Sequence, residues 1–346
     1  MPHRNIPIFI PHLGCPNQCV FCNQRSISGC RSFREETVRE QIETALATIP
    51  ASCETEIAFF GGSFTGIDRD LMIRLLETAQ EYVRAGRVAS IRLSTRPDYI
   101  SDEILSLLSR YAVRVIELGL QSMDDKVLAA CRRGHTKEQA IDACRAVVNA
   151  GFELVGQMMI GLPSATPASE VETARTICAL GASAARIYPT VVFYDTPLAD
   201  MTENGSYTPL TQEDAVRRSA EVLRIFLEKG IPCIRIGLSS SEELTDREKV
   251  MAGANHPALG ELVWNEYYYG ELVKALQASH LLGRSVILEL PARELSKVVG
   301  QHRSNIEKLL RETDTRVRKI VGQENLCEMV ALPYPAKEQE EEQPCI

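Results

Sequence analysis

The sequence lacks a long hydrophobic run. It has no stretch of about 18 or more consecutive apolar residues, the length needed for a helix that crosses a membrane. The first residues, MPHRNIPIFIPHLG, carry one short apolar run without the longer apolar region and small-residue cleavage site of a secretory signal. These absences predict a cytoplasmic protein with no membrane partner.

Positive charge is also in short supply. The chain has 38 Lys and Arg against 46 Asp and Glu, a net charge of −8, which excludes wholesale coating of nucleic acid but permits a local basic patch. The hydrophobic share of 45% is ordinary for a globular protein with a sizeable core. Cysteine, in contrast, is abundant at 11 residues. Without a secretory signal, these cysteines are expected to be reduced thiols or metal ligands.

Short β-rich runs alternate with amphipathic helical stretches from residue 6 to about 240. This alternation predicts an α/β fold with a parallel sheet, helices outside it and active-site residues beyond the carboxyl ends of the strands. Roughly six or seven such units fit an open or nearly closed α/β barrel. The expected strands are NIPIFIPHL, EIAFFGG, SIRLSTRP, VIELGLQS, LVGQMMIGLP, ARIYPTVV and IPCIRIGL, and the expected helices cover 37–49, 68–85, 101–110, 136–150, 168–181 and 211–229.

The pattern changes after residue 240. We expect a barrel domain over 1–240, an aromatic-rich connecting and helical segment over 241–283, and a small basic α+β segment over 284–332. That last segment reads as strand, helix, turn, helix, strand, strand. Residues 333–346 are acidic and rich in proline and glutamate, and they predict a disordered tail.

The N-terminal cysteines have the spacing of metal ligands. GCPNQCVFCNQ places Cys15, Cys19 and Cys22 as C-x3-C-x2-C. An electron-transfer cluster uses four cysteines, whereas three leave one iron open for a substrate. The alternative is a small zinc site, with His12 as the nearby fourth ligand, or three unrelated cysteines. Downstream, GGSFTG ends a predicted strand, and Gly61 and Gly62 there allow close approach of backbone to a ligand.

Seven motifs in order carry a resemblance to a known family. The cysteine loop, GGSFTG, STRPDYI, VIELGLQS, RRGHT, GLP and ARIYPTVVFYDTPL resemble the radical S-adenosylmethionine (SAM) domain of the elongator catalytic subunit. They are more distantly similar to oxygen-independent coproporphyrinogen oxidase. The resemblance covers residues 5 to about 237. It implies a partial (β/α)6 barrel, a [4Fe–4S] cluster, SAM and an external reductant of the flavodoxin or ferredoxin type.

The resemblance also implies roles for single residues. It makes Cys15, Cys19 and Cys22 the ligands of the cluster. One electron from that cluster is expected to cleave SAM and give a 5′-deoxyadenosyl radical. It places Gly61 and Gly62 against the methionyl group of SAM. Four further positions line the SAM pocket, namely Gln121, Arg133 and two departures from the family pattern, Ser94 and Gln157. An arginine there is expected to pair with the methionyl carboxylate, and the alternative for Arg133 is a solvated helix residue.

Tyr188 matches a strand near the pocket mouth. It is expected either to face the target of the radical, as a catalytic residue, or to fill the barrel. We expect the acetyltransferase domain of the elongator subunit to be absent, because too few residues follow position 237.

The C-terminal basic segment resembles a KH RNA-binding domain, in which a GxxG loop between two helices clamps the nucleotide backbone. Here Gly300 begins the loop but Arg303 holds the fourth position, so the motif is degenerate. Residues 284–322 contain nine Lys and Arg against five Asp and Glu. The expected phosphate contacts are Arg303, Lys308, Arg316, Arg318 and Lys319. The alternative is a cap or dimer contact with ordinary surface charge.

Three functions follow as hypotheses. The first is an elongator-like radical SAM enzyme that modifies RNA, with tRNA as the expected partner. The second is a radical SAM enzyme that acts on a small molecule such as a tetrapyrrole. The third is a non-catalytic RNA-binding protein in which the cysteines hold a structural metal.

Overall fold

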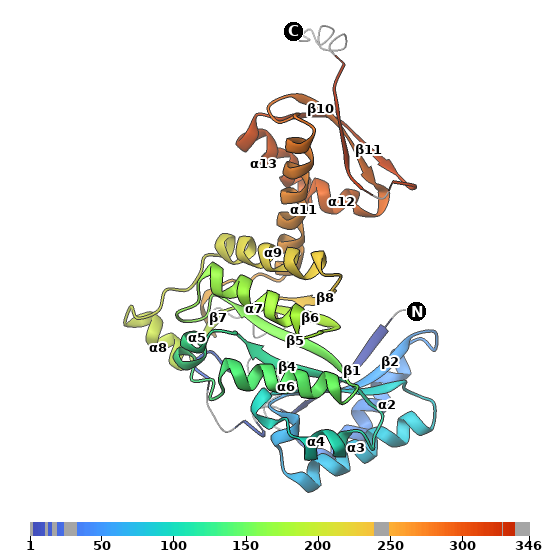
Figure 1. Cartoon of the computed structure of the whole chain (residues 1–346). Helices are drawn as coiled ribbons and strands as arrows, with labels where there is room; N and C mark the ends of the chain where they lie inside the picture. Colours follow the sequence, from blue (N-terminus) through green and yellow to red (C-terminus); the bar gives the residue numbers. More distant parts are fainter. Residues whose placement is uncertain are drawn as a thin grey trace. The chain divides into compact units, whose positions relative to one another are not determined.

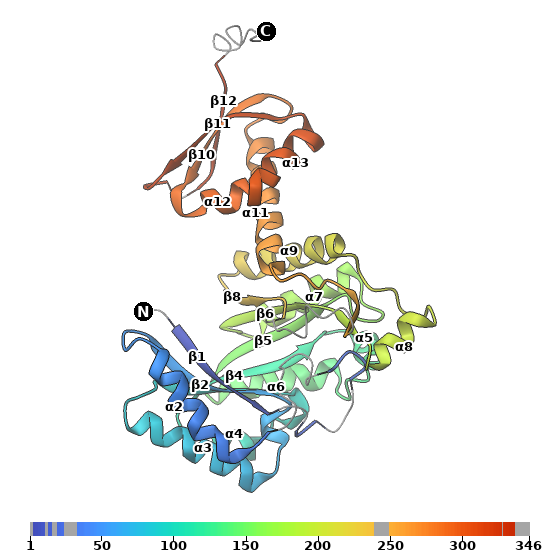
Figure 2. The same cartoon turned by 180° about the vertical axis from the view of Figure 1, so that it is seen from behind.

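The computed structural model describes residues 3–10, 13–15, 19–23, 33–238, 249–326 and 328–335. Contacts divide the chain into two compact units, Met1–Leu259 and Gly260–Ile346. Figures 1 and 2 show the first from blue to yellow and the second from orange to red. Of the predicted features, His12 and residues 336–346 of the tail lie outside the described residues. The boundaries expected at 240, 283 and 332 stay predictions.

The first unit is built on a seven-stranded sheet in the order β1-β2-β3-β4-β5-β6-β8. Every neighbouring pair is parallel. The strands are β1 (His3–Ile10), β2 (Glu54–Gly61), β3 (Ser90–Thr95), β4 (Val113–Gln121), β5 (Glu153–Ile160), β6 (Ala184–Pro189) and β8 (Cys233–Ile236). The predicted α/β fold with a parallel partial barrel is thereby confirmed.

Helices connect successive strands, as a parallel sheet requires. They are α2 (Val38–Thr48), α3 (Arg69–Arg84), α4 (Asp102–Leu108), α5 (Asp125–Ala130), α6 (Lys137–Asn149), α7 (Pro167–Ala179), α8 (Pro197–Glu203) and α9 (Gln212–Glu228). Their starts follow from local chemistry. Thr136 and Gln139 form a reciprocal capping box at α6, and the Asp68 carboxylate accepts from the Leu71 amide at α3.

The two faces of the sheet differ in polarity. In strands β1 to β5, alternate residues are mostly fully buried aliphatic or aromatic side chains, such as Ile8, Phe59 and Leu93. Helices cover one face of this sheet (Figure 1). The intervening positions carry polar side chains, such as Glu117 and Gln157, together with apolar ones such as Phe60.

The predicted strand ARIYPTVV is broken into two. β6 ends at Pro189, and β7 (Val191–Phe193) leaves the main sheet to pair antiparallel with β9 (Val250–Gly253). The amide and hydroxyl of Thr190 both donate to the carbonyl of Ile160, at 2.9 and 2.7 Å. These bonds hold the chain at the end of β5 while it turns away.

The second unit is a small α+β structure, as predicted. α11 (Leu259–Ala278) is followed by β10 (Ser285–Pro291), α12 (Leu295–Val299), α13 (Ser304–Thr313), β11 (Arg316–Gln323) and β12 (Val330–Pro333). The sheet order is β11-β10-β12, with β10 parallel to β11 and antiparallel to β12. Its core contains Leu272, Val286, Leu288, Val298 and Leu309.

Within the described residues, no helix is long and apolar enough to cross a membrane.

Candidate functional site

The predicted cluster cysteines follow β1, at the edge of the sheet where the parallel strands end. Cys19 is buried, whereas Cys15 and Cys22 are half-buried. The Sγ atom of Cys15 lies 3.5 Å from the Ser63 hydroxyl, in the loop after β2. Between the last two cysteines, Val20 is 1% exposed and its amide donates to the carbonyl of Cys131 at 3.2 Å. The loop is therefore anchored on both sides of Cys19.

Glycine at positions 61 and 62 lets the backbone of the cysteine loop lie directly against the end of β2. A Cβ at Gly62 would stand 1.9 Å from the carbonyl oxygen of Leu13, and one at Gly61 would stand 2.8 Å from the backbone of Ile10. A Cβ at Gly14 would meet the Ser63 carbonyl oxygen at 2.3 Å. These glycines thus have a packing reason that needs no ligand, and their predicted contact with SAM stays a prediction.

Two buried arginines surround Cys19. Its Sγ atom accepts from Nη1 of Arg133 at 3.3 Å and from Nη1 of Arg96 at 3.8 Å. Arg133 also donates to the carbonyl of Gly119 at 2.5 Å, and its own carbonyl accepts from Arg96. With 6% of its surface exposed, Arg133 is no solvated helix residue, so that alternative is wrong. Two guanidinium groups thus donate to one sulfur atom.

The arginine pair is held by a second layer of side chains. Arg96 donates from Nε and Nη2 to the two carboxylate oxygens of Asp98, each at 2.9 Å. The buried His135 ring lies 3.9 Å from the same carboxylate. Burial, reinforced by the charge of Arg133, lowers the pKa of His135 to about 4, so its imidazole is neutral at physiological pH. The guanidinium of Arg96 is fixed in a planar, two-bond pairing.

Three of the residues predicted to line a SAM pocket, Ser94, Gln121 and Gln157, lie on the neighbouring strands β3, β4 and β5. Ser94 on β3 is in register with Glu117 on β4, and Gln157 on β5 is in register with Gly119. The amide of Gln157 donates to the Gln121 side chain at 3.2 Å. Gln121 itself has a left-handed backbone (φ 67°), at an irregularity in the pairing of β4 with β5. Such a conformation is uncommon for glutamine and directs its side chain away from the regular alternation.

Tyr188 lies on the inner face of β6. Its hydroxyl oxygen accepts from Nη1 of Arg186 at 3.1 Å, and Arg186 forms a 3.0 Å ion pair with the buried Glu117. Burial raises the pKa of Tyr188, while the charge of Arg186 opposes that rise. Because the oxygen accepts a hydrogen bond, the hydroxyl proton remains available to another acceptor. The half-buried phenol therefore presents a donor to the barrel interior.

The C-terminal candidates fall in two places within the second unit. Gly300 ends α12 at φ 78°, and a Cβ there would meet the Ser304 hydroxyl at 2.5 Å, so the turn requires glycine. Arg303 follows in an exposed loop with a left-handed backbone (φ 65°). The remaining exposed candidates lie on the edge strand β11 and are Arg316, Arg318 and Lys319.

Lys308 differs from the other basic candidates. Its ammonium lies 2.7 Å from Glu266 and 4.1 Å from the centroid of the Tyr269 ring. Its side chain is 25% exposed. These contacts give Lys308 a structural role within the unit, which the charge pattern of the sequence did not indicate.

Sequence reasoning missed Arg96, Asp98 and His135 as parts of the site. All three stand in motifs that were singled out, STRPDYI and RRGHT, but no role was assigned to them. A buried arginine two residues before an aspartate was the available signal, since such pairs hold guanidinium groups in place.

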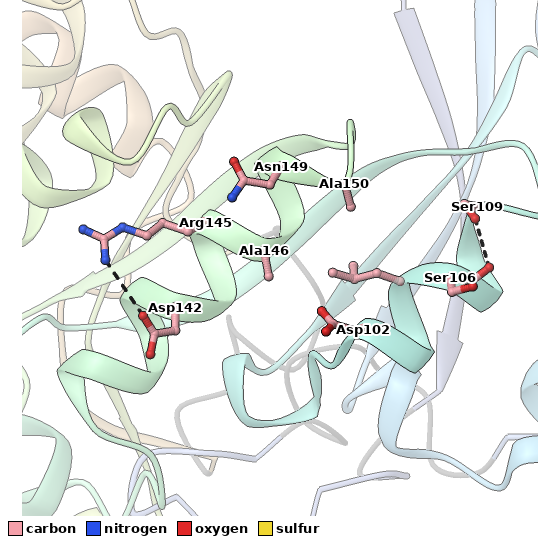
Figure 3. Close-up of a pocket in the computed structure, with 9 residues that line it drawn as sticks. Asp102, Ser106, Ser109, Asp142, Arg145, Ala146, Asn149 and Ala150 are labelled. Carbon is pink, nitrogen blue, oxygen red and sulfur yellow. Dashed lines mark hydrogen bonds and ion pairs between the residues drawn. The ribbon is translucent and has the colours of Figure 1, made fainter.

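A surface pocket of about 670 Å³ lies elsewhere, between the exposed sides of α4 and α6. Figure 3 shows it to be bordered by the Asp142–Arg145 ion pair on α6 and by Ser106 and Ser109 on α4. None of its lining residues belongs to the predicted site.

The cysteine donors fit an iron–sulfur group in chemistry. Over the described ranges, which omit 16–18 and 24–32, no three His, Cys, Asp or Glu side chains gather closely enough to hold a metal ion. The loop nevertheless supplies three thiol donors beside two guanidinium groups. Among the described residues, the buried Nε atom of Arg133 has no hydrogen-bond partner, which leaves a donor for an anionic group. In contrast, burial raises the pKa of the neighbouring Cys131 thiol to about 12, as expected of an apolar packing group.

Two family models match the chain. The model of the radical SAM superfamily covers residues 9–177, and that of the radical SAM C-terminal domain covers residues 182–269. Together the two models cover most of the half-barrel, the three cysteines of the loop, and Arg96 and Arg133. Proteins of this superfamily use a [4Fe–4S] cluster and SAM.

Among curated proteins, the chain is similar to an uncharacterised archaeal protein and to proteins named for tRNA or elongator function. An uncharacterised protein of Methanocaldococcus jannaschii is 28% identical over 71% of this chain and 77% of its own length. A tRNA uridine(34) acetyltransferase of Methanocaldococcus infernus is 27% identical over 55% of this chain, and elongator complex protein 3 of Homo sapiens is 27% identical over 65%. The chain spans only 35% and 48% of those two relatives.

Among solved structures, archaeal Elp3 of Methanocaldococcus infernus, solved with an N-terminal deletion, superposes with a TM-score of 0.59. It is 19% identical and covers 82% of this chain and 66% of its own. At that identity the likeness concerns the fold, which the two chains share.

Proposed function

Because this chain belongs to the radical SAM superfamily, with elongator-like relatives, we propose that it is a radical SAM enzyme that modifies RNA, with tRNA as substrate. Cys15, Cys19 and Cys22 hold the [4Fe–4S] cluster in this proposal. When bound, the cluster and SAM supply a 5′-deoxyadenosyl radical that abstracts hydrogen from the substrate. The family assignment makes the chain an enzyme and disfavours the non-catalytic alternative.

The observation that carries the cluster assignment is the surroundings of Cys19. The Sγ atom of this buried cysteine accepts hydrogen bonds from two guanidinium groups, at 3.3 and 3.8 Å. Guanidinium donors balance the negative charge that an iron-bound thiolate carries. Arg96 and Arg133 therefore suit a cluster ligand at this position.

The inner face of the half-barrel supplies the rest of the pocket. We assign Gly61, Gly62, Ser94, Gln121 and Gln157 to contacts with SAM, and Arg133 to its carboxylate through the unpartnered Nε. Three polar side chains on adjacent strands, two of them joined at 3.2 Å, suit the hydroxyl groups of a ribose. Tyr188 faces the substrate. An electron donor of the flavodoxin or ferredoxin type is required from outside the chain.

RNA as substrate is supported by two independent features. Two relatives are named for tRNA or elongator function, although the chain spans half or less of each. The second unit exposes basic residues on a glycine-initiated loop and on an edge strand, in an otherwise acidic protein. Arg303, Arg316, Arg318 and Lys319 are the phosphate contacts in this proposal, with Gly300 shaping the loop, and Lys308 supports them structurally.

The test compares tRNA from a deletion strain with tRNA from wild type by nucleoside mass spectrometry. We expect one modified nucleoside to disappear, and to return with the wild-type chain but not with Cys19→Ala. Identical nucleoside profiles, together with a changed pool of a small metabolite, would overturn the RNA assignment in favour of a small-molecule substrate.

Binding is measured separately from turnover. Arg303→Glu is expected to weaken tRNA binding by about tenfold, and raising the salt concentration is expected to weaken wild-type binding in the same sense. Arg145→Glu, on the outside of α6, is the matched control, because it makes the same charge change in the first unit. Wild-type binding that ignores salt would contradict a phosphate-based contact.

A further inference from the structure

Two arginines of the inner face, Arg186 and Arg235, lie on the strands farthest from the cysteine loop. The loop follows β1, at one end of the sheet order, whereas β6 and β8 lie at the other end. Arg186 on β6 is in register with Gln157 on one side and with Arg235 on β8 on the other. The SAM-facing residues and these arginines therefore line one wall at the same height.

Arg186 is fixed by three contacts. Its Nε atom lies 3.0 Å from the buried carboxylate of Glu117, and its Nη1 donates to the Tyr188 hydroxyl at 3.1 Å. Its guanidinium carbon stands 5.1 Å from the centroid of the Phe60 ring. A planar group held by a carboxylate, a phenol and an aromatic face has little freedom left. Its charge is matched by Glu117.

Among the described residues, Arg235 has no such match. It lies opposite Arg186 in the register of β6 with β8, on the strand next to Tyr188. Within the described ranges, however, no carboxylate approaches Arg235 within ion-pair distance. In contrast, Arg92 on β3 forms an ion pair with Glu56, with 3.0 Å between its Nη2 atom and the Glu56 carboxylate. Counted over the described residues alone, the wall formed by β6 and β8 thus carries one positive charge more than its carboxylates balance.

An uncompensated guanidinium in a half-buried wall is stabilised when an anion binds to it. Arginine presents several N–H donors in a planar fork, which fits the oxygens of phosphate or carboxylate. Tyr188, on the neighbouring strand, adds a hydroxyl proton that no contact of the described residues uses. Two donors of different kinds therefore lie on adjacent strands of the inner face.

We propose that the inner wall of β6 and β8 is an oxyanion subsite, in which Arg235 and Tyr188 bind a phosphate of the substrate. The proposal rests on the proposed RNA function, since the phosphate is that of the nucleotide whose base or sugar the radical attacks. Arg186 is a positioning residue, because it acts through Tyr188. Binding at this place holds the nucleotide across the barrel from the cysteine loop.

The test measures binding of uridine 5′-monophosphate, uridine and glutarate to the reconstituted enzyme by calorimetry. Wild type is expected to bind the monophosphate about tenfold or more tightly than uridine, the size of one charged hydrogen-bonded contact. Arg235→Gln is expected to abolish that preference, and Arg235→Lys to keep part of it. Arg145→Gln, an exposed arginine on α6, is the control and should keep the whole preference.

Equal affinities of wild type for uridine and its monophosphate would overturn the subsite, as would an Arg235→Gln variant that keeps the preference. Circular dichroism and the thermal midpoint of Arg235→Gln confirm that a lost preference is not lost folding. Tighter binding of glutarate than of the monophosphate would overturn the assignment to phosphate and also count against RNA as substrate. Loss of the phosphate preference in Arg235→Gln alongside an unchanged tRNA profile in the deletion strain would support the subsite while overturning the RNA function.

Discussion

Gly62→Ala should disable the cysteine loop through a single added methyl group. That Cβ would stand 1.9 Å from the Leu13 carbonyl oxygen and 3.0 Å from the Leu13 carbonyl carbon. Ordinary contact needs about 3.5 Å, so the Leu13 backbone must retreat by roughly 1.5 Å. The retreat weakens the 3.0 Å bond from the Ser63 amide to that oxygen. Overpacking of about 1–3 kcal/mol and a hydrogen bond of about 1 kcal/mol give a loss of about 2–4 kcal/mol.

The assay pairs chemical denaturation with iron and sulfide content after anaerobic reconstitution. Gly151→Ala is the matched control, because Gly151 has a left-handed backbone (φ 86°) with open space where the Cβ would go. That change costs about 1–2 kcal/mol from backbone strain and touches no part of the loop. Both variants should be less stable, but only Gly62→Ala should lose most of its iron. A Gly62→Ala protein with wild-type stability and iron content would refute the packing argument.

Three further changes test the surrounding structure. Although burial opposes ionisation, hydrogen bonding from a buried serine hydroxyl and the charge of Arg92 lower the pKa of Glu56 to about 2. The ionised group therefore stabilises the fold above pH 4.5, its ordinary value, and that contribution, on the order of 3 kcal/mol, is lost as the pH falls toward 2. In an acid titration, Glu56→Gln should make the free energy of unfolding less dependent on pH between about 4.5 and 2. An unchanged slope of that free energy against pH would contradict the pairing of Glu56 with Arg92. Arg218→Ala should cost about 3–5 kcal/mol in urea unfolding, because it leaves the 4% exposed Glu170 side chain without its 2.6 Å partner; a cost under about 1 kcal/mol would count against it. Tyr188→Phe should keep 5′-deoxyadenosine formation but lose substrate conversion, and a variant that converts substrate normally would remove Tyr188 from the catalytic residues.

The sheet was predictable because each strand carries its own signal. Runs such as EIAFFGG and VIELGLQS are apolar, short and bounded by turn residues, and a parallel sheet buries them on both sides. The break of ARIYPTVV was not predictable, since it depends on Thr190 bonding to the carbonyl of Ile160, about 30 residues earlier. Local pattern indicates a strand but not which partner it keeps.

The same distinction between local pattern and long-range contact applies to the candidate site. The spacing of Cys15, Cys19 and Cys22 is local, so the sequence displays it. The arrangement around Cys19 joins residues 77 and 114 positions away in the chain, and no local pattern reports that distance. For Lys308, its place in a basic segment indicates only a phosphate contact, which stays a prediction. Folding also brings Glu266 to it from 42 positions away, and no local pattern reports that pairing.

The most direct test of the central claim is reductive cleavage of SAM by the purified chain. After anaerobic reconstitution with iron and sulfide, the protein is reduced with dithionite in the presence of SAM, and 5′-deoxyadenosine is measured by chromatography and mass spectrometry. We expect wild type to form it, and Cys19→Ala to form none while its circular dichroism shows the half-barrel intact. Absence of 5′-deoxyadenosine from a wild-type protein loaded with its cluster, or undiminished formation by Cys19→Ala, would contradict the account.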